Sequence, residues 1–151
     1  MTLSIRRATA ADLDTLAPLF DRYRQFYGQH GDSAASHAFI AQRLQRDESV
    51  VLLAQLDGAA AGFTQLYPSF SSVRAARVWV LNDLYVDDSA RRRGVAQALL
   101  AAAAEFARGD GALRLVLETN PDNHAAQALY ESRGWQRYDD TLRYLLPLAA
   151  G

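Results

Sequence analysis

The stretch at residues 91–96 constrains this chain more than any other. It reads Arg-Arg-Arg-Gly-Val-Ala and lies between an apolar run that ends at Val86 and an alanine-rich helix that begins near Val95. A strand, a short loop and a helix in this order direct free backbone N–H groups and the positive end of the helix dipole at one point. Gly94 lets the backbone approach closely, so the segment predicts a site for a diphosphate. On this segment alone, an arginine-flanked helix start at the surface explains the sequence equally well.

Two common phosphate-binding loops are excluded by the sequence. The chain contains no lysine, so the lysine-containing ATP loop cannot form. The residues from Gly94 to Leu99 also lack the three-glycine dinucleotide pattern. A small anionic ligand of another kind therefore fits better.

Size and composition narrow the function further. The 151 residues suffice for one domain with a core, and we expect a single domain over residues 1–151. The net charge is −1 and the basic residues are scattered apart from 91–93, so neither nucleic acid nor a membrane is an expected partner. The absence of cysteine excludes disulfides, thiolate zinc sites and a cysteine-linked intermediate.

Metal binding and targeting give no positive signal. The histidines His30, His37 and His124 share no metal-ligand spacing, so no metal site is expected. The charged start of the chain has no apolar signal region, and no run of eighteen apolar residues occurs. We therefore expect a cytoplasmic protein.

Hydrophobic periodicity and turn residues predict the order of the elements. Asp57-Gly58 is a hairpin signal, and Thr9 with Asp12 resembles a capping box at a helix start. The predicted strands are 3–7, 50–56, 61–67, 78–86, 113–119, 135–138 and 142–148. The predicted helices are 9–27, 33–47, 94–108 and 121–132.

These features together resemble the GNAT N-acetyltransferase superfamily. The resemblance rests on three groups of residues: Leu84-Tyr85-Val86, then Arg91-x-x-Gly94-x-Ala96, then Asn123 and Tyr130, which lie seven residues apart ahead of Gly134-Trp135. The resemblance covers essentially the whole chain, including element order. It implies the α/β (α+β) GNAT fold, a mixed, mostly antiparallel seven-stranded sheet flanked by four helices, whose fourth and fifth strands splay apart. Within the superfamily, the run from Leu84 to Trp135 is most similar to the histone and polyamine acetyltransferase branch.

The resemblance implies an acetyl-CoA-dependent N-acetyltransferase. Its acceptor would be a primary amine on a small cationic amine or polyamine, an amino acid or a protein. The pantetheine arm would pair with the fourth strand, the diphosphate would lie on the arginine-glycine loop, and an N–H near Val86 would stabilise the oxyanion. The implied cofactor-binding residues are Leu84, Tyr85, Val86, Arg91, Arg92, Arg93, Gly94, Val95, Ala96, Asn123 and Tyr130.

Three residues are candidates for proton transfer. Tyr130 matches the family's general acid, and a phenol with a pKa near 10 can share a proton with a thiol near 8.5. Asp83, Glu118 and an ordered water chain are the candidate routes for removing the proton of the amine. The polyamine-acetylating relatives carry a Glu-Asp pair where this chain has Asn82 and Asp83, and an asparagine cannot take a proton. Since no cysteine can carry the acyl group, direct attack in a ternary complex is implied.

Two functions other than acetyl transfer are also compatible with the sequence. A catalytically silent acyl-CoA-binding or regulatory domain could use the same fold, although mere binding does not require a proton donor at Tyr130. A nucleic-acid-binding domain could use the arginines at 91–93, but three arginines do not make a face. Family analogy also suggests a homodimer, with the segment 142–148 as its contributor.

Overall fold

The computed structural model describes residues 1–149 of the chain. The chain divides into two compact units, one from Met1 to Glu118 and one that begins at Thr119. The first unit holds the sheet and the first three α-helices, and the second holds the fourth helix. Each unit is described by itself.

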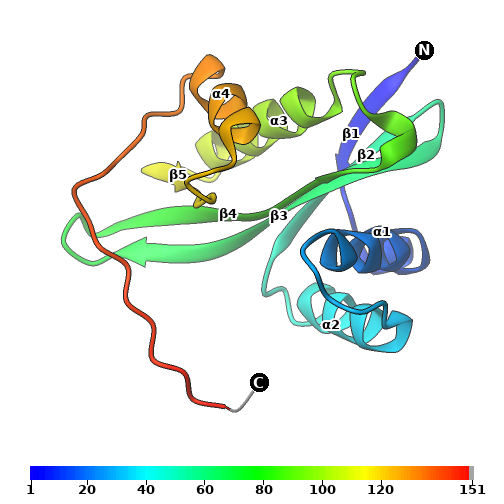
Figure 1. Ribbon diagram of the computed structural model, residues 1–151, viewed down its shortest axis with the longest axis horizontal. Coiled ribbons are helices and arrows are strands. Elements are labelled where there is room, and N and C mark those ends of the chain that lie inside the picture. The colour runs from blue at the N-terminus through cyan, green and yellow to red at the C-terminus, as the bar shows by residue number, and fades with distance from the viewer. Residues whose placement is uncertain (150–151) are drawn as a thin grey trace. The chain divides into compact units, whose positions relative to one another are not determined.

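A five-stranded mixed sheet runs through the first unit (Figure 1). Its strands are β1 (Leu3–Arg7), β2 (Val50–Leu56), β3 (Ala59–Ser71), β4 (Ala76–Val86) and β5 (Arg114–Val116). The first four strands pair antiparallel in chain order, and β5 joins β4 in parallel. The predicted hairpin turn is present, since Asp57 and Gly58 have φ angles of 50° and 84°, the signs that a type I′ turn requires.

The prediction of a seven-stranded sheet is wrong, because the described part of the chain supplies five strands. Neither 135–138 nor 142–148 forms a strand. The apolar pattern there is typical of strands, but a strand also needs a neighbour for its N–H and C=O groups, and Pro147 lacks the N–H. The leucines of this segment are exposed, Leu142 at 82% and Leu146 at 80%.

The four predicted helices form, with small shifts of their ends. They are α1 (Leu13–Phe26), α2 (Ser33–Gln45), α3 (Val95–Gly109) and α4 (His124–Ser132). Two short 3-10 helices, η1 (Ala10–Asp12) and η2 (Asp88–Ala90), lie before α1 and α3. The capping box predicted at Thr9 is confirmed, and the Thr9 N–H donates to Asp12 Oδ2 at 2.8 Å.

Helix α4 begins three residues later than the sequence predicts. Asn120 and Pro121 are good residues for a helix start, but the N-cap is Asn123, whose side-chain oxygen accepts the N–H of Ala126 at 3.2 Å. Both asparagines satisfy the same rule, so the rule alone does not choose between them.

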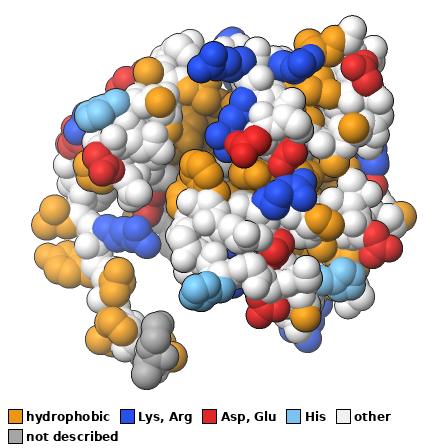
Figure 2. Space-filling view, turned by 45° about the vertical axis from the view of Figure 1, so that its right-hand side comes forward, with side chains coloured by type: hydrophobic (Ala, Val, Ile, Leu, Met, Phe, Trp, Pro, Cys, Tyr) orange, Lys and Arg blue, Asp and Glu red, His pale blue; other side chains and the backbone are white. Residues whose placement is uncertain are grey.

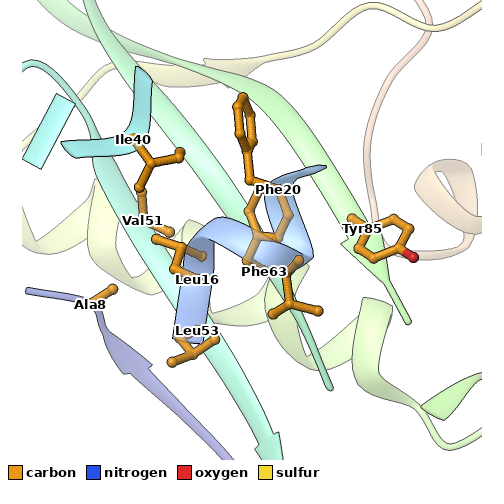
Figure 3. Close-up of a cluster of buried hydrophobic side chains, with 9 residues drawn as sticks. Ala8, Leu16, Phe20, Ile40, Val51, Leu53, Phe63 and Tyr85 are labelled. Atoms are coloured by element: carbon orange, nitrogen blue, oxygen red, sulfur yellow. The ribbon is translucent and has the colours of Figure 1, made fainter. Parts of the chain in front are cut away.

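Helices α1 and α2 cover one face of the sheet and α3 covers the other (Figure 1). Figure 3 shows the core on the α1 face, where helix and strand side chains point toward one another. The labelled residues of this core are Ala8, Leu16, Phe20, Ile40, Val51, Leu53, Phe63 and Tyr85. Burial of each large apolar side chain contributes roughly 1.5–3 kcal/mol, so the cluster fixes α1 over the sheet.

A β-bulge interrupts the pairing of β3 with β4. Gln65 pairs with Asp83, but the next residue of β3, Leu66, pairs with Leu81. Asn82 is therefore an extra residue with no partner opposite it.

The bulge switches the sheet face to which β4 directs its side chains. Before it, Trp79 packs on Phe106 of α3, with the ring centroids 5.0 Å apart. After it, Asp83 contacts Tyr23 of α1 on the opposite face. In an unbroken strand, residues 79 and 83 would share a face, because side chains alternate with a period of two. The extra residue thus brings Asp83 to α1.

Strand β5 pairs with β4 over three positions, from Val78 to Val80. It ends at Val116, whereas β4 continues to Val86. Along 81–86 the β5 side of β4 has no paired strand within the described chain. Such an edge offers N–H and C=O groups to an extended ligand.

Candidate functional site

The predicted diphosphate loop joins the end of β4 to the start of α3. The cofactor residues predicted in this unit follow one another here: Leu84, Tyr85 and Val86 end β4, Arg91, Arg92, Arg93 and Gly94 form the loop, and Val95 and Ala96 open α3. Gly94 is the N-cap, and no side chain caps the helix at this residue. Gly94 itself supplies no side-chain acceptor at the start of α3, and a helix N-terminus of this kind binds anions.

The backbone of the loop has an unusual conformation. Arg92 and Gly94 both adopt positive φ angles, 63° and 77°. Glycine enters this region without steric cost, but a residue with a Cβ enters it at a cost of about 1–2 kcal/mol. The positive φ at Gly94 turns the chain directly into the helix.

Asp87 anchors the loop to the first unit. Its N–H donates to the carbonyl of Ala61 at 2.8 Å, and its Oδ1 accepts from Arg22 Nε at 2.8 Å. Ser89 Oγ donates to its Oδ2 at 3.0 Å. Burial alone would raise the pKa of Asp87, but the hydrogen bonds from Ser89 and Arg22 and the charge of Arg22 outweigh it and lower the pKa. These contacts fix the turn that leads from β4 into the loop.

The arginines of the loop are exposed, and two of them have contacts of their own. Arg91 lies 3.0 Å from the Asp88 carboxylate and 5.5 Å from the centre of the Phe26 ring. Arg93 Nη1 contacts the Met1 sulfur at 3.3 Å. These surface contacts are weak, so the side chains remain available to a phosphate.

A cavity of about 510 Å³ lies between α1, α2 and the strands β3 and β4. Small-molecule sites typically enclose about 300–1,000 Å³. Half of its lining residues are aromatic, namely Phe20, Tyr23, Tyr27, Phe39 and Tyr67. The others are Arg24, Gln29, Ala35, Asn82 and Asp83.

Asp83 is the acidic residue of this cavity, and its side chain is held by three donors. Tyr23 Oη and Asn82 Nδ2 each donate to Oδ1 at 2.9 Å, and Gln65 Nε2 donates to Oδ2. Asp83 is only 4% exposed. A carboxylate offers about four lone-pair sites, so one site remains for a further donor.

Gln65 is itself fixed from behind. It is fully buried, and its Oε1 accepts a hydrogen bond from the buried Ser49 Oγ at 2.8 Å. This contact directs the amide NH₂ group to Asp83. Ser49, Gln65 and Asp83 form a buried polar chain that sets the orientation of the carboxylate.

The two tyrosines beside Asp83 are shifted toward their neutral forms. Burial, followed by the charge of Asp83, raises the pKa of Tyr23 well above its ordinary value. Burial and the charge of Asp83 raise the pKa of Tyr67 to about 12, against an opposing effect of Arg43. Both phenols therefore keep their protons near neutral pH and can donate hydrogen bonds.

Of the other predicted site residues, Glu118 ends the first unit, and Asn123 and Tyr130 belong to the second. Glu118 is exposed, two residues beyond the end of β5. In the second unit, Asn123 caps α4, and Tyr130 lies half-buried on the same helix with its ring 6.0 Å from that of Trp135. In the first unit, Asp83 lies on β4, and the loop residues follow directly after that strand.

Tyr23, Gln65 and the bulge at Asn82 were not predicted from the sequence. Two signals are present in the sequence. Tyr23 extends the aromatic spacing of Phe20 along α1, and a polar Asn82-Asp83 pair interrupts an otherwise apolar strand, as a bulge often does. Gln65 gives no signal beyond being a lone polar residue in an apolar run.

Among residues 1–149, no group of three or more metal-ligating side chains comes together. None of the helices described there is long and apolar enough to cross a membrane.

Comparison with known sequences gives a consistent set of relatives. Residues 14–135 match the model of the acetyltransferase (GNAT) family. The uncharacterized N-acetyltransferase YhfO of Bacillus subtilis is 43% identical over 148 residues, 98% of this chain and 99% of the relative. An aminoglycoside N(6′)-acetyltransferase type 1 of Klebsiella aerogenes is 30% identical over 112 residues, 73% of this chain and 74% of the relative.

Solved structures agree with the sequence relatives. The crystal structure of a probable acetyltransferase has a TM-score of 0.92 and 45% identity, and the match covers 98% of this chain and 99% of that one. An aminoglycoside N-acetyltransferase in complex with CoA has a TM-score of 0.78 and 25% identity, with 96% and 95% covered.

Proposed function

Because this chain belongs to the acetyltransferase (GNAT) family, we propose that it transfers the acetyl group of acetyl-CoA to a primary amine by direct attack in a ternary complex. Its relatives are named N-acetyltransferases, and the chain is an N-acetyltransferase. One observation carries the proposal. A helix start without a capping side chain, suited to a diphosphate, follows the strand that places a buried carboxylate in a cavity of small-molecule size.

The cofactor is assigned to β4 and the loop after it. The diphosphate binds the first N–H groups of α3, with Gly94 allowing its close approach and the arginines at 91–93 adding positive charge. The pantetheine arm lies along Leu84 to Val86, where β4 has no β5 partner in the described chain. An N–H near Val86 stabilises the oxyanion, and Asn123 contacts the cofactor arm. A structural relative is in complex with CoA, which supports CoA as the ligand.

The chemistry requires two proton movements. The amine nitrogen attacks the thioester carbon, the C–S bond breaks, and the CoA sulfur leaves as a thiolate. A primary amine with a pKa near 10 is neutral only about once in a thousand at pH 7, so a carboxylate must accept its proton. Tyr130 donates a proton to the thiolate, and solvent restores the proton of the phenol.

Asp83 is the better candidate to receive the amine. It is buried in the cavity, it is oriented by three donors, and one acceptor site remains, whereas Glu118 is exposed. Glu118, or a water that it positions, is the second candidate for the base. Asn82 acts on this site by donating to Asp83 and by forming the bulge.

Thiol release from acetyl-CoA with a panel of amines tests the proposal. We expect turnover with at least one primary amine, and we expect Tyr130→Phe to lose turnover while it keeps its affinity for acetyl-CoA. Binding without turnover on a broad panel would favour a silent acyl-CoA-binding domain instead.

Finer assignments belong to the same proposal. We propose a single functional domain over residues 1–151, a cytoplasmic location and a sequence relationship to the histone and polyamine acetyltransferase branch that does not itself fix the acceptor. We propose a homodimer through the segment 142–148, whose apolar side chains are exposed in the described chain. We assign no nucleic-acid partner, since Arg, Asp and Glu side chains are interspersed on the face in Figure 2.

A further inference from the structure

The charges that line the cavity are one carboxylate and one guanidinium. Asp83 and Arg24 are the charged residues there, and burial raises the pKa of Tyr23 and of Tyr67, so both phenols keep their protons. The Arg24 guanidinium is half-buried and donates to Ser36 Oγ at 3.2 Å. The lining therefore offers one negative charge to a ligand and, near it, a positive charge that repels a second cation.

The walls of the cavity consist of aromatic rings. Phe20 and Phe39 are stacked, with centroids 5.4 Å apart and an interplanar angle of 7°. Tyr23 and Tyr27 meet edge to face at 5.1 Å. Arg43 lies 4.4 Å from the centre of the Phe39 ring and already supplies a cation to it. Walls of this kind favour a flat apolar body.

The hydrogen-bonding capacity of Asp83 limits the ligand further. Three of about four lone-pair sites are occupied, so the carboxylate can accept one more hydrogen bond. A second ammonium in the same cavity would lose its hydration without gaining a charged partner, which is strongly unfavourable.

We infer that the acceptor carries a single ammonium group on an aromatic or similarly flat apolar body, and that polycations are poor acceptors. The inference rests on the proposed function, because it names the acceptor class of that transfer. It departs from the aminoglycoside relatives, whose names refer to acceptors that carry several amines.

The test compares three acceptors with the purified full chain and acetyl-CoA. They are 2-phenylethylamine, spermidine and kanamycin, and thiol release gives kcat/KM for each. We expect 2-phenylethylamine to exceed both polycations by about tenfold or more.

A charge variant tests whether the cavity sets this preference. Ala35 is exposed on α2 and lines the cavity, so Ala35→Glu adds a second carboxylate there. We expect the kcat/KM ratio of spermidine to 2-phenylethylamine to rise about fivefold or more. Ala38→Glu is the matched control, because Ala38 is exposed on the same helix and is not among the lining residues. The control should leave the ratio unchanged.

Calorimetric titration with CoA distinguishes an error in the proposed function from an error in the acceptor class alone. If CoA does not bind, the proposed function is wrong and this inference falls with it. If CoA binds and a polycation is the better acceptor, or 2-phenylethylamine does not react, only the acceptor class is wrong. An unchanged ratio in Ala35→Glu would also overturn the inference.

Discussion

Among single residues, Asp83 provides the test of whether the cavity is catalytic. Asp83→Asn keeps the size of the side chain and removes the negative charge that the incoming amine needs. We expect kcat/KM to fall about 100-fold or more while the affinity for CoA is unchanged. Thiol release and calorimetry measure the two quantities.

Two further variants sharpen this prediction. Asp14→Asn makes the same change on α1 at a side chain that is 99% exposed, and should leave kcat/KM unchanged. Glu118→Gln tests the competing base. A larger loss in Glu118→Gln than in Asp83→Asn would transfer the role of base to Glu118.

Gly94 offers a second test, because Gly111, which follows α3, is a well-matched reference glycine outside the loop. Gly94 and Gly111 have φ angles of 77° and 76°, and a Cβ at either position would meet nothing within 4 Å. Alanine at each site should therefore reduce stability by a similar amount, about 1 kcal/mol. Only Gly94→Ala should weaken CoA binding, by about tenfold, measured by calorimetry. Equal CoA affinities in the two variants would contradict the assignment of the loop.

At the scale of elements, Gly62 allows β3 and β4 to approach each other. A Cβ on Gly62 would overlap the carbonyl oxygen of Tyr85 and lie 3.2 Å from the Cα of Val86. Gly62→Ala should therefore lower the free energy of unfolding by about 2–4 kcal/mol, because the obstacle is backbone in the middle of the sheet. Urea unfolding followed by circular dichroism measures the change.

The matched control lies in α3. A Cβ on Gly109 meets nothing within 4 Å, and this residue ends the helix, so Gly109→Ala should be neutral or slightly stabilising. A Gly62→Ala variant as stable as the control would show that the two strands can separate without loss.

Elements fixed by local chemistry were predictable from the sequence, and elements fixed by pairing were less so. The Asp57-Gly58 turn and the Thr9 capping box depend on a few neighbouring residues, and both are confirmed. The bulge at Asn82 depends on the register of two strands, which an apolar run does not reveal. Asp83 was predicted as a candidate base. Its tyrosine and glutamine partners were not predicted, because they depend on that register.

At the scale of the whole molecule, stability should fall at high pH because of Tyr67. Its pKa is about 12 in the folded chain and 10 ordinarily. The folded state keeps the proton that the unfolded state loses, so the contribution is complete below pH 10 and is lost as the pH rises from 10 to 12. The full shift corresponds to at most about 2.7 kcal/mol, and solvent access reduces it.

Unfolding in urea between pH 8 and pH 11.5 measures this contribution. The loss of stability over that range should be about 1 kcal/mol smaller in Tyr67→Phe than in the native chain. Identical losses in the two proteins would show that Tyr67 ionises as easily folded as unfolded.

The arrangement of the sheet shows where sequence reasoning ends. The order of the first five strands and four helices was predictable, because each has its own periodicity and turn residues. The two last strands were not, since the apolar pattern from 142 to 148 cannot specify a neighbour. The family comparison supports the N-acetyltransferase function independently of that error.

Calorimetric titration of the native chain with CoA and with pantetheine, which lacks the diphosphate, shows whether the start of α3 holds the cofactor. We expect CoA to bind and pantetheine to bind at least about tenfold more weakly, because pantetheine cannot use the N–H groups at the start of α3. No binding of CoA, or equal affinities for the two ligands, would contradict this expectation.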